Sequence, residues 1–167
     1  MKVLFCDVDG VLNNSRTKAR SPSGYTGVSD DLIRNLRRIV KETGAVIVLS
    51  SDWRLVRDDP EHGKDYRYLV RKLRFVGHLR IADHTIDISW RWRGHEIKAY
   101  LDDHPQVTEY VILDDLPFRD FLVNGMLSRL VLTNPKEGLT DADVIRAVSI
   151  LNGENVKAID TRLFMTG

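Results

Sequence analysis

Short apolar runs and longer amphipathic stretches alternate along the chain. Four runs have the length of buried strands, at residues 3–6, 45–49, 109–113 and 129–133, and a weaker one lies near 79–82. Their apolar residues are continuous rather than alternating with polar ones, which indicates strands covered on both faces, as in a parallel sheet.

The amphipathic stretches between these runs predict helices. Apolar residues recur at helical spacing between Ser29, an N-cap candidate, and Gly44, a C-cap candidate. Three further helices are expected at residues 66–75, 94–103 and 141–151, the last capped by Thr140. Strands and helices that alternate in this way predict an α/β fold: a Rossmann-like parallel sheet with helices on both faces.

Composition narrows the class of protein. The 167 residues fit a single domain spanning 1–167, and 43% of them are hydrophobic, which is enough to bury a core. The net charge of +1 gives no general sign of nucleic-acid binding. One cysteine, Cys6, permits no internal disulfide, and we see neither a signal peptide nor a membrane span. We therefore expect a cytoplasmic protein without membrane contact, of undetermined oligomeric state.

Polar residues follow three of the predicted strands directly. Asp7, Ser50 and Asp114 each stand at the carboxyl end of a strand, and in an open parallel sheet ligands bind beyond those ends. Asp7 and Asp114, helped by Asp115, would give an oxygen-lined site suited to Mg²⁺. A carboxylate can also attack phosphorus, and Asp9, two residues on, can exchange a proton with the leaving oxygen and then with water.

Three motifs carry a resemblance to a known superfamily. Residues 7–13 read Asp-Val-Asp-Gly-Val-Leu-Asn after a strand, Ser50 follows another strand, and Asp114-Asp115 follows a third. This order resembles the haloacid dehalogenase (HAD) superfamily, and the resemblance spans residues 1 to about 135. Segments 50–54, 93–97 and 113–115 together are similar to a branch with phosphatase-like domains of RNA-repair proteins.

The resemblance implies roles for the acidic residues. Asp7 would be the nucleophile and a metal ligand, and Asp9 the general acid and base, with its backbone carbonyl on the metal. Asp114 would be a metal ligand, and Asp115 would stand beside it on the metal's water shell. The implied enzyme is a Mg²⁺-dependent phosphatase that works through an aspartyl-phosphate.

For the residues that bind the phosphate, the sequence leaves more than one candidate. Ser50 and Ser51 are the candidates that donate hydrogen bonds to phosphoryl oxygens. The cation that balances the phosphate charge, a lysine in many HAD proteins, is expected near the helix before the third clear strand. Arg93 is the first candidate there, and Lys98 and Arg91 are its competitors.

Neither position at which HAD proteins insert a cap leaves room for a full one in this chain. We therefore expect little or no cap and an open site, which admits a bulky phosphorylated substrate such as a nucleotide or a nucleic-acid end. Residues 67–98 contain eight Lys or Arg against three acids, with aromatic residues between them. We favour a solvated helix face for this segment over nucleic-acid binding.

Two other functions remain open. A non-catalytic module could use the acidic cluster only to bind a cation or a phosphorylated partner, but it would have no need for Asp9. Phosphotransfer or phosphonate chemistry could use the same scaffold, and the presence of Asp9 favours ester hydrolysis because the leaving oxygen needs a proton. Trp53 is expected to pack in the core, and Arg54 either holds a loop or reaches the site.

Overall fold

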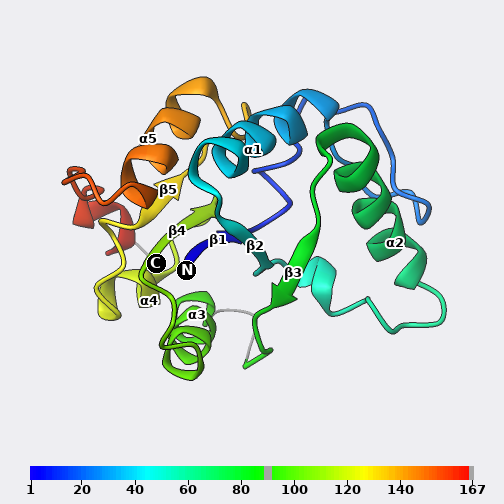
Figure 1. The fold of residues 1–167 in the computed structure, drawn as a ribbon. Coiled ribbons are helices and arrows are strands. Elements are labelled where there is room, and N and C mark those ends of the chain that lie inside the picture. The colour runs from blue at the N-terminus through cyan, green and yellow to red at the C-terminus, as the bar shows by residue number, and fades with distance from the viewer. Residues whose placement is uncertain (89–91, 166–167) are drawn as a thin grey trace.

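A computed structural model describes residues 1–88 and 92–165 of the chain. Five parallel strands form one sheet in the order β3-β2-β1-β4-β5 (Figure 1). They are β1 (Lys2–Cys6), β2 (Val46–Leu49), β3 (Ile81–His84), β4 (Glu109–Asp114) and β5 (Leu130–Leu132). This order confirms the predicted Rossmann-like α/β class, and its reversal point lies between β1 and β4, where such sheets bind ligands.

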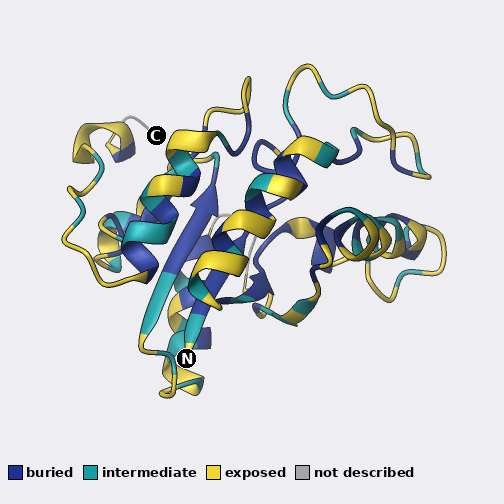
Figure 2. Cartoon of the chain, turned by 45° about the horizontal axis from the view of Figure 1, so that its top comes forward, coloured by how far each residue is buried: buried dark blue, intermediate teal, exposed yellow. Residues whose placement is uncertain are grey.

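Helices cover both faces of the sheet. They are α1 (Asp30–Thr43), α2 (Gly63–Lys72), α3 (Arg93–Asp103), α4 (Arg119–Val123) and α5 (Asp141–Leu151). Successive residues of β1 point to opposite faces, so Leu4 packs in one apolar cluster with α1, α2 and α5, and Phe5 packs in the other with α3 and α4. The sheet is consequently buried on both sides, and the helices expose only their outward faces (Figure 2).

The predicted elements are confirmed with two differences. The weak strand lies at 81–84 instead of 79–82, because the chain leaves the preceding helix through His78 in a left-handed conformation (φ 53°) before the strand can begin. Helix α4 was not predicted, since five residues are too few to show helical periodicity. Thr140 and Gly44 cap α5 and α1 as expected, whereas the Ser29 side chain forms no capping hydrogen bond.

Little stands above the carboxyl edge of the sheet. The loop 13–28 closes on itself through one antiparallel bridge, Arg20 to Thr26, and packs against α2, where Asp65 accepts a hydrogen bond from the Ser23 backbone (2.9 Å). Residues 50–80 contribute a short 3₁₀ turn (Asp52–Arg54), α2 and a π-helical turn (Leu73–Gly77). The expectation of little or no cap is therefore confirmed for the described residues.

The segment after α5 ends in a 3₁₀ turn, Thr161–Phe164, whose Phe164 is buried in the same cluster as α3 and α4. Within residues 1–88 and 92–165, no helix has the length and apolarity needed to cross a membrane.

Candidate active site

The strand register brings the predicted residues to one edge of the sheet. Backbone hydrogen bonds from Asp7 to Leu113 (3.0 Å) and from Ser50 to Cys6 (3.0 Å) extend the pairing of β1 with β4 and β2 by one step. Asp114 is the last residue of β4 and is fully buried. Asp7, Ser50 and Asp114 therefore stand side by side at the reversal point of the sheet.

Three carboxylates meet at this point. One oxygen each from Asp7, Asp114 and Asp115 can be chosen so that all three lie within 4.8 Å of one another. Burial, and then repulsion from Asp7, raises the pKa of Asp114 well above its usual range and that of Asp115 to about 6. Burial also raises the pKa of Asp7, although the charge of Arg93 opposes this shift. The Oδ2 oxygen of Asp114 is buried and forms no hydrogen bond to a described residue.

Gly10 makes room for this cluster. Its φ of +71° is a left-handed conformation, and a Cβ atom built on it would lie 2.4 Å from the Asp115 Cγ. The Thr133 hydroxyl holds the turn by donating a hydrogen bond to the Gly10 carbonyl (2.8 Å). Only glycine fits both the backbone conformation and the close approach of the carboxylate.

Asp9 lies in a different environment from Asp7. Its side chain is exposed, and it accepts hydrogen bonds from the Trp53 indole N–H (2.9 Å) and from the Asn13 amide (2.8 Å). Asn13 in turn accepts a hydrogen bond from the Gly10 backbone (2.9 Å), so the loop itself fixes the amide. Asp9 also lines a cavity of about 530 Å³, with Tyr25, Thr26, Asp52, Trp53, Val56, His62 and Asp65.

The two serines have unequal partners. The Ser50 hydroxyl is buried and forms no hydrogen bond to a described residue. Ser51 accepts a long hydrogen bond from the Trp53 backbone (3.4 Å). Its hydroxyl also acts on Asp7, where its hydrogen bond opposes the rise that burial causes in the pKa of that carboxyl. Ser50 thus offers a hydroxyl that has no partner among the described residues, at the end of the strand next to the acid cluster.

Arg93 is the cation that the structure brings to the aspartates. It begins α3 and is buried, with Nη1 4.0 Å from Asp7 Oδ1 and Nη2 3.4 Å from Asp52 Oδ1. Its guanidinium also lies over the Phe118 ring, 5.6 Å from the centroid. Burial acts to lower the pKa of Arg93, but the surrounding carboxylates, Asp114 first, leave it raised.

The two competing cations are placed differently. Lys98 is exposed on α3, and its ammonium forms an ion pair with Asp102, with distances of 2.5 and 2.7 Å to the two carboxylate oxygens. Its contacts with described residues do not include the aspartates of β1 and β4, so the structure does not bring Lys98 to the cluster. Arg91 lies outside the described residues.

Comparison with known proteins agrees with this geometry. A family model described as the HAD domain in Swiss Army Knife RNA repair proteins matches residues 3–144. The chain belongs to this family. Neither the curated proteins nor the solved structures give a match. The match covers the five strands, except for Lys2 at the start of β1, and every residue of the site described above.

A divalent cation fits the acid cluster of this HAD domain. HAD proteins in general use Mg²⁺, and the cluster supplies only oxygen donors, which a hard cation such as Mg²⁺ prefers. Asp114 Oδ2 is a buried acceptor that has no hydrogen-bond partner among the described residues, and a bound cation would satisfy it. The same charge would remove the repulsion that raises the pKa values of these carboxyls. Asp7, Asp114 and Asp115 are the side chains that would hold it.

Buried polar contacts fix the start of α3, which carries Arg93. Arg54 forms a buried ion pair with Glu96 (2.8 Å), and its Nε donates to the Thr85 carbonyl (3.1 Å). Asp120 accepts a hydrogen bond from the His95 backbone (2.9 Å) at the same end of the helix. Arg54 therefore ties α3 to the loop after β3, which answers the question that the sequence left open. No spacing in the sequence pairs these residues, so Glu96 and Asp120 could not be predicted as supports of the site.

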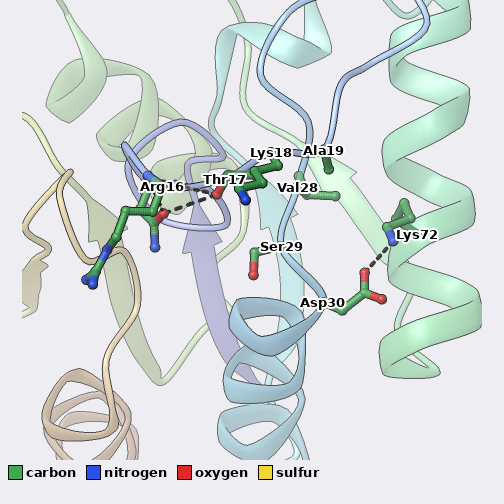
Figure 3. Close-up of a pocket in the computed structure, with 9 residues that line it drawn as sticks. Arg16, Thr17, Lys18, Ala19, Val28, Ser29, Asp30 and Lys72 are labelled. Carbon is green, nitrogen blue, oxygen red and sulfur yellow. Dashed lines mark hydrogen bonds and ion pairs between the residues drawn. The ribbon is translucent and has the colours of Figure 1, made fainter.

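A second cavity, of about 450 Å³, lies where the loop 13–28 enters α1 (Figure 3). Arg16, Lys18 and Lys72 line it, but Lys72 points at Asp30 and forms an ion pair with it. The Asn14 side chain, also in its lining, is bound to the Glu137 carbonyl (2.9 Å). This cavity therefore contains groups that are already partly paired, and it shares no lining residue with the cavity at Asp9.

Proposed function

We propose that this HAD domain is a magnesium-dependent phosphomonoesterase that removes a terminal phosphate from RNA. The observation that carries the proposal is the difference in surroundings between Asp7 and Asp9. Asp7 is buried within the acid cluster, beside Arg93, whereas Asp9 is exposed and lines the adjoining cavity. Two carboxylates in such different surroundings suit a nucleophile and a proton carrier.

The proposed reaction has two steps. A carboxylate oxygen of Asp7 attacks the phosphorus, the bond to the ester oxygen breaks, and Asp9 gives that oxygen its proton. Asp9 then takes a proton from water, the water oxygen attacks the phosphorus, and the acyl-phosphate bond breaks to release inorganic phosphate and free Asp7. The hydrogen bonds from Trp53 and Asn13 hold the Asp9 carboxylate toward the cavity in which the leaving group would lie.

The remaining groups would stabilise the charge of the phosphoryl group. A bound Mg²⁺ would neutralise the carboxylates and the phosphoryl oxygens. Ser50 has a hydroxyl without a partner, and Arg93 Nη1 is buried and forms no hydrogen bond to a described residue, so both are available to phosphoryl oxygens. Neither group needs to break a hydrogen bond within the described part of the chain to act.

The cavity at Asp9 has the size and lining for one nucleoside. Its volume of about 530 Å³ is in the usual range for small-molecule sites. Tyr25 is 62% exposed and presents an aromatic face on which a base can stack. The carboxylates of Asp52 and Asp65 in the lining disfavour further phosphates there but can accept hydrogen bonds from ribose hydroxyls. This combination supports a nucleoside carrying a single terminal phosphate.

Phosphate release from 3′- and 5′-phosphorylated oligoribonucleotides, from mononucleotides and from p-nitrophenyl phosphate tests the proposal. With Mg²⁺ the wild-type protein should release phosphate, and Asp7→Asn should abolish release while the thermal midpoint shows that the fold persists. Asp9→Asn should lower the rate by about 10²–10⁴-fold on substrates with poor leaving groups. Full turnover by Asp7→Asn would refute the nucleophile.

A phosphoenzyme trap separates the two steps. p-Nitrophenol needs little help to leave, so Asp9→Asn should still be phosphorylated on Asp7 by ³²P-labelled p-nitrophenyl phosphate but release the label slowly. Label that survives acid quenching and disappears in Asp7→Asn supports the intermediate. A module that only binds phosphate would show no labelled protein, and a phosphotransferase would pass the label to an added alcohol rather than to water.

A further inference from the structure

The outward face of α2 and of the π-helical turn that follows it carries four cations. Lys64, Arg67 and Arg71 are exposed on α2, and at 3.6 residues per turn they fall within an arc of roughly 60°; Arg74 is exposed in the π-helical turn. We call these four residues the basic ridge. It extends over roughly 15 Å of helix and lies opposite the side that buries Leu69.

The ridge lacks the acidic partners found elsewhere on the surface. Among the described residues, none of its four members forms an ion pair. On α1, by contrast, Arg34 pairs with Asp31, and Arg38 pairs with Asp141 of α5. The one basic residue of α2 that does pair is Lys72, which points away toward α1 (Figure 3).

The positive charge of the chain is concentrated around the basic ridge. Residues 63–80 contain six basic residues and one acidic residue, a net charge of +5, and since the whole chain is +1 the remainder is −4. Cations three and four residues apart repel one another and destabilise a helix. A polyanion laid along the ridge would relieve that repulsion, whereas a merely solvated face would gain from mixed charges.

The first turn of α2, which carries Lys64 of the basic ridge, borders the cavity of the proposed active site. His62 and Asp65, which flank the first residues of α2, line the same cavity as Asp9 and Trp53. At the other end of the ridge Phe75 is 73% exposed in the π-helical turn, where a base can stack on its ring. At 3.6 residues per turn Asp65 lies about 100° around α2 from Lys64, so a strand whose end lies at Asp9 would pass around the first turn of the helix to reach the ridge.

We propose that the basic ridge binds the phosphate backbone of a single-stranded polynucleotide whose terminal phosphate lies at Asp7. The proposal rests on the proposed function for the position of the strand's end, and it adds the surface that distinguishes a polynucleotide from a mononucleotide. Backbone contacts of this kind give affinity without sequence preference.

The test compares two variants that each remove three exposed positive charges from one helix. Arg67→Ala/Arg71→Ala/Arg74→Ala alters the ridge, and Arg34→Ala/Arg37→Ala/Lys41→Ala makes the matched change on α1. Binding of a fluorescein-labelled, terminally phosphorylated oligoribonucleotide is followed by anisotropy over a salt series, with Asp7→Asn in every protein to prevent turnover.

Each phosphate contact contributes about 0.7 to the slope of log affinity against log salt, so the ridge variant should lose about 2 from its slope and at least roughly tenfold in affinity at low salt. The α1 variant should keep the wild-type slope. The conservative variant Arg67→Lys/Arg71→Lys/Arg74→Lys should keep most of the slope that the alanine ridge variant loses. The proposal would be overturned if the two alanine variants had equal salt slopes, or if both lost affinity equally.

Kinetics keep this outcome separate from that of the proposed function. With Asp7 intact, the ridge variant should lose at least roughly tenfold in kcat/KM for the oligonucleotide relative to p-nitrophenyl phosphate. If no substrate is hydrolysed by the wild type, the proposed function fails, and the anisotropy series still decides on the ridge. If hydrolysis occurs and both substrates respond equally, the ridge alone is refuted.

Discussion

Methionine in place of Arg54 would leave Glu96 as a buried carboxylate without its cation. The two side chains are 4% and 2% exposed, and their closest atoms, Arg54 Nη2 and Glu96 Oε2, are 2.8 Å apart. Removing one partner of such a pair costs about 3–5 kcal/mol, because the remaining charge stays desolvated. For a chain of this size that corresponds to a fall of roughly 6–20 °C in the thermal midpoint.

The loss should also depend on pH. Burial raises the pKa of Glu96, and Arg54 is the main influence that holds it down. Without Arg54 the pKa of Glu96 in the folded state lies still further above its value in the unfolded state. Protonated Glu96 then favours the folded state at low pH, and this contribution is lost as the pH rises through the folded pKa. The variant should therefore lie closer to wild type at about pH 5 than at about pH 8.

Urea denaturation of Arg54→Met, Glu96→Met and the double variant measures the coupling directly. An apolar pair avoids the unpaired charge, so the double variant should recover at least half of the loss seen in Arg54→Met. It should not recover all of it, since the Thr85 and Ile86 carbonyls lose the N–H donors of Arg54. A cost below about 1 kcal/mol for Arg54→Met, or strictly additive single costs, would refute the reasoning.

Three further predictions concern the acid cluster and its surroundings. Gly10→Ala places a Cβ 2.4 Å from Asp115 Cγ, so calorimetry should show about tenfold weaker divalent-cation binding, and wild-type affinity would contradict the fit. Trp53→Phe removes the indole N–H that donates to Asp9, and in phosphate-release assays kcat should fall roughly tenfold with little change in KM. A roughly tenfold rise in KM with unchanged kcat would instead indicate a role in binding. The pKa values of Asp114 and Asp115 are raised in the cation-free folded state, that of Asp115 to about 6. Both carboxyls therefore stabilise the fold at low pH, and the contribution of Asp115 is lost as the pH rises from about 4 through 6. Asp115 alone accounts for about 1–2 kcal/mol after allowance for its partial exposure, and thermal midpoints measured with EDTA should fall as the pH rises from about 4 to about 7, whereas saturating Mg²⁺ should flatten the curve.

The part of the site that follows strand order was predictable from the sequence. Continuous apolar runs identified parallel strands, and a parallel sheet must bring the residues after each strand to one edge, so Asp7, Ser50 and Asp114 were expected together. Gly44 and Thr140 were likewise predictable as caps, because their roles depend on neighbours within a few residues. In each case the physical cause is local or follows from topology.

Contacts between side chains far apart in sequence were not predictable. The partner of Arg54 is Glu96, 42 positions away on another element, and no periodicity relates the two. The choice between Arg93 and Lys98 depended on which side of α3 faces the sheet. The two residues are five positions apart, so the helix points the Lys98 side chain in a different direction from that of Arg93. Trp53 was expected in the core, and its indole N–H on Asp9 adds a polar contact to that packing.

An arginine at position 93 suits this site for a geometric reason. Its Nη2 approaches Asp52, while Nη1, on the other arm of the fork, lies 4.0 Å from Asp7 and forms no hydrogen bond to a described residue. A lysine has one charged nitrogen and would have to choose between these two directions, whereas the planar guanidinium can keep Asp52 on one arm and offer the other to a phosphoryl oxygen. In the proposed reaction Asp52 would therefore aim the cation, and the same residue lines the cavity in which the leaving group would lie. Loss of Asp52 should accordingly impair Arg93 and the leaving-group site together, although Asp52 itself stands outside the acid cluster.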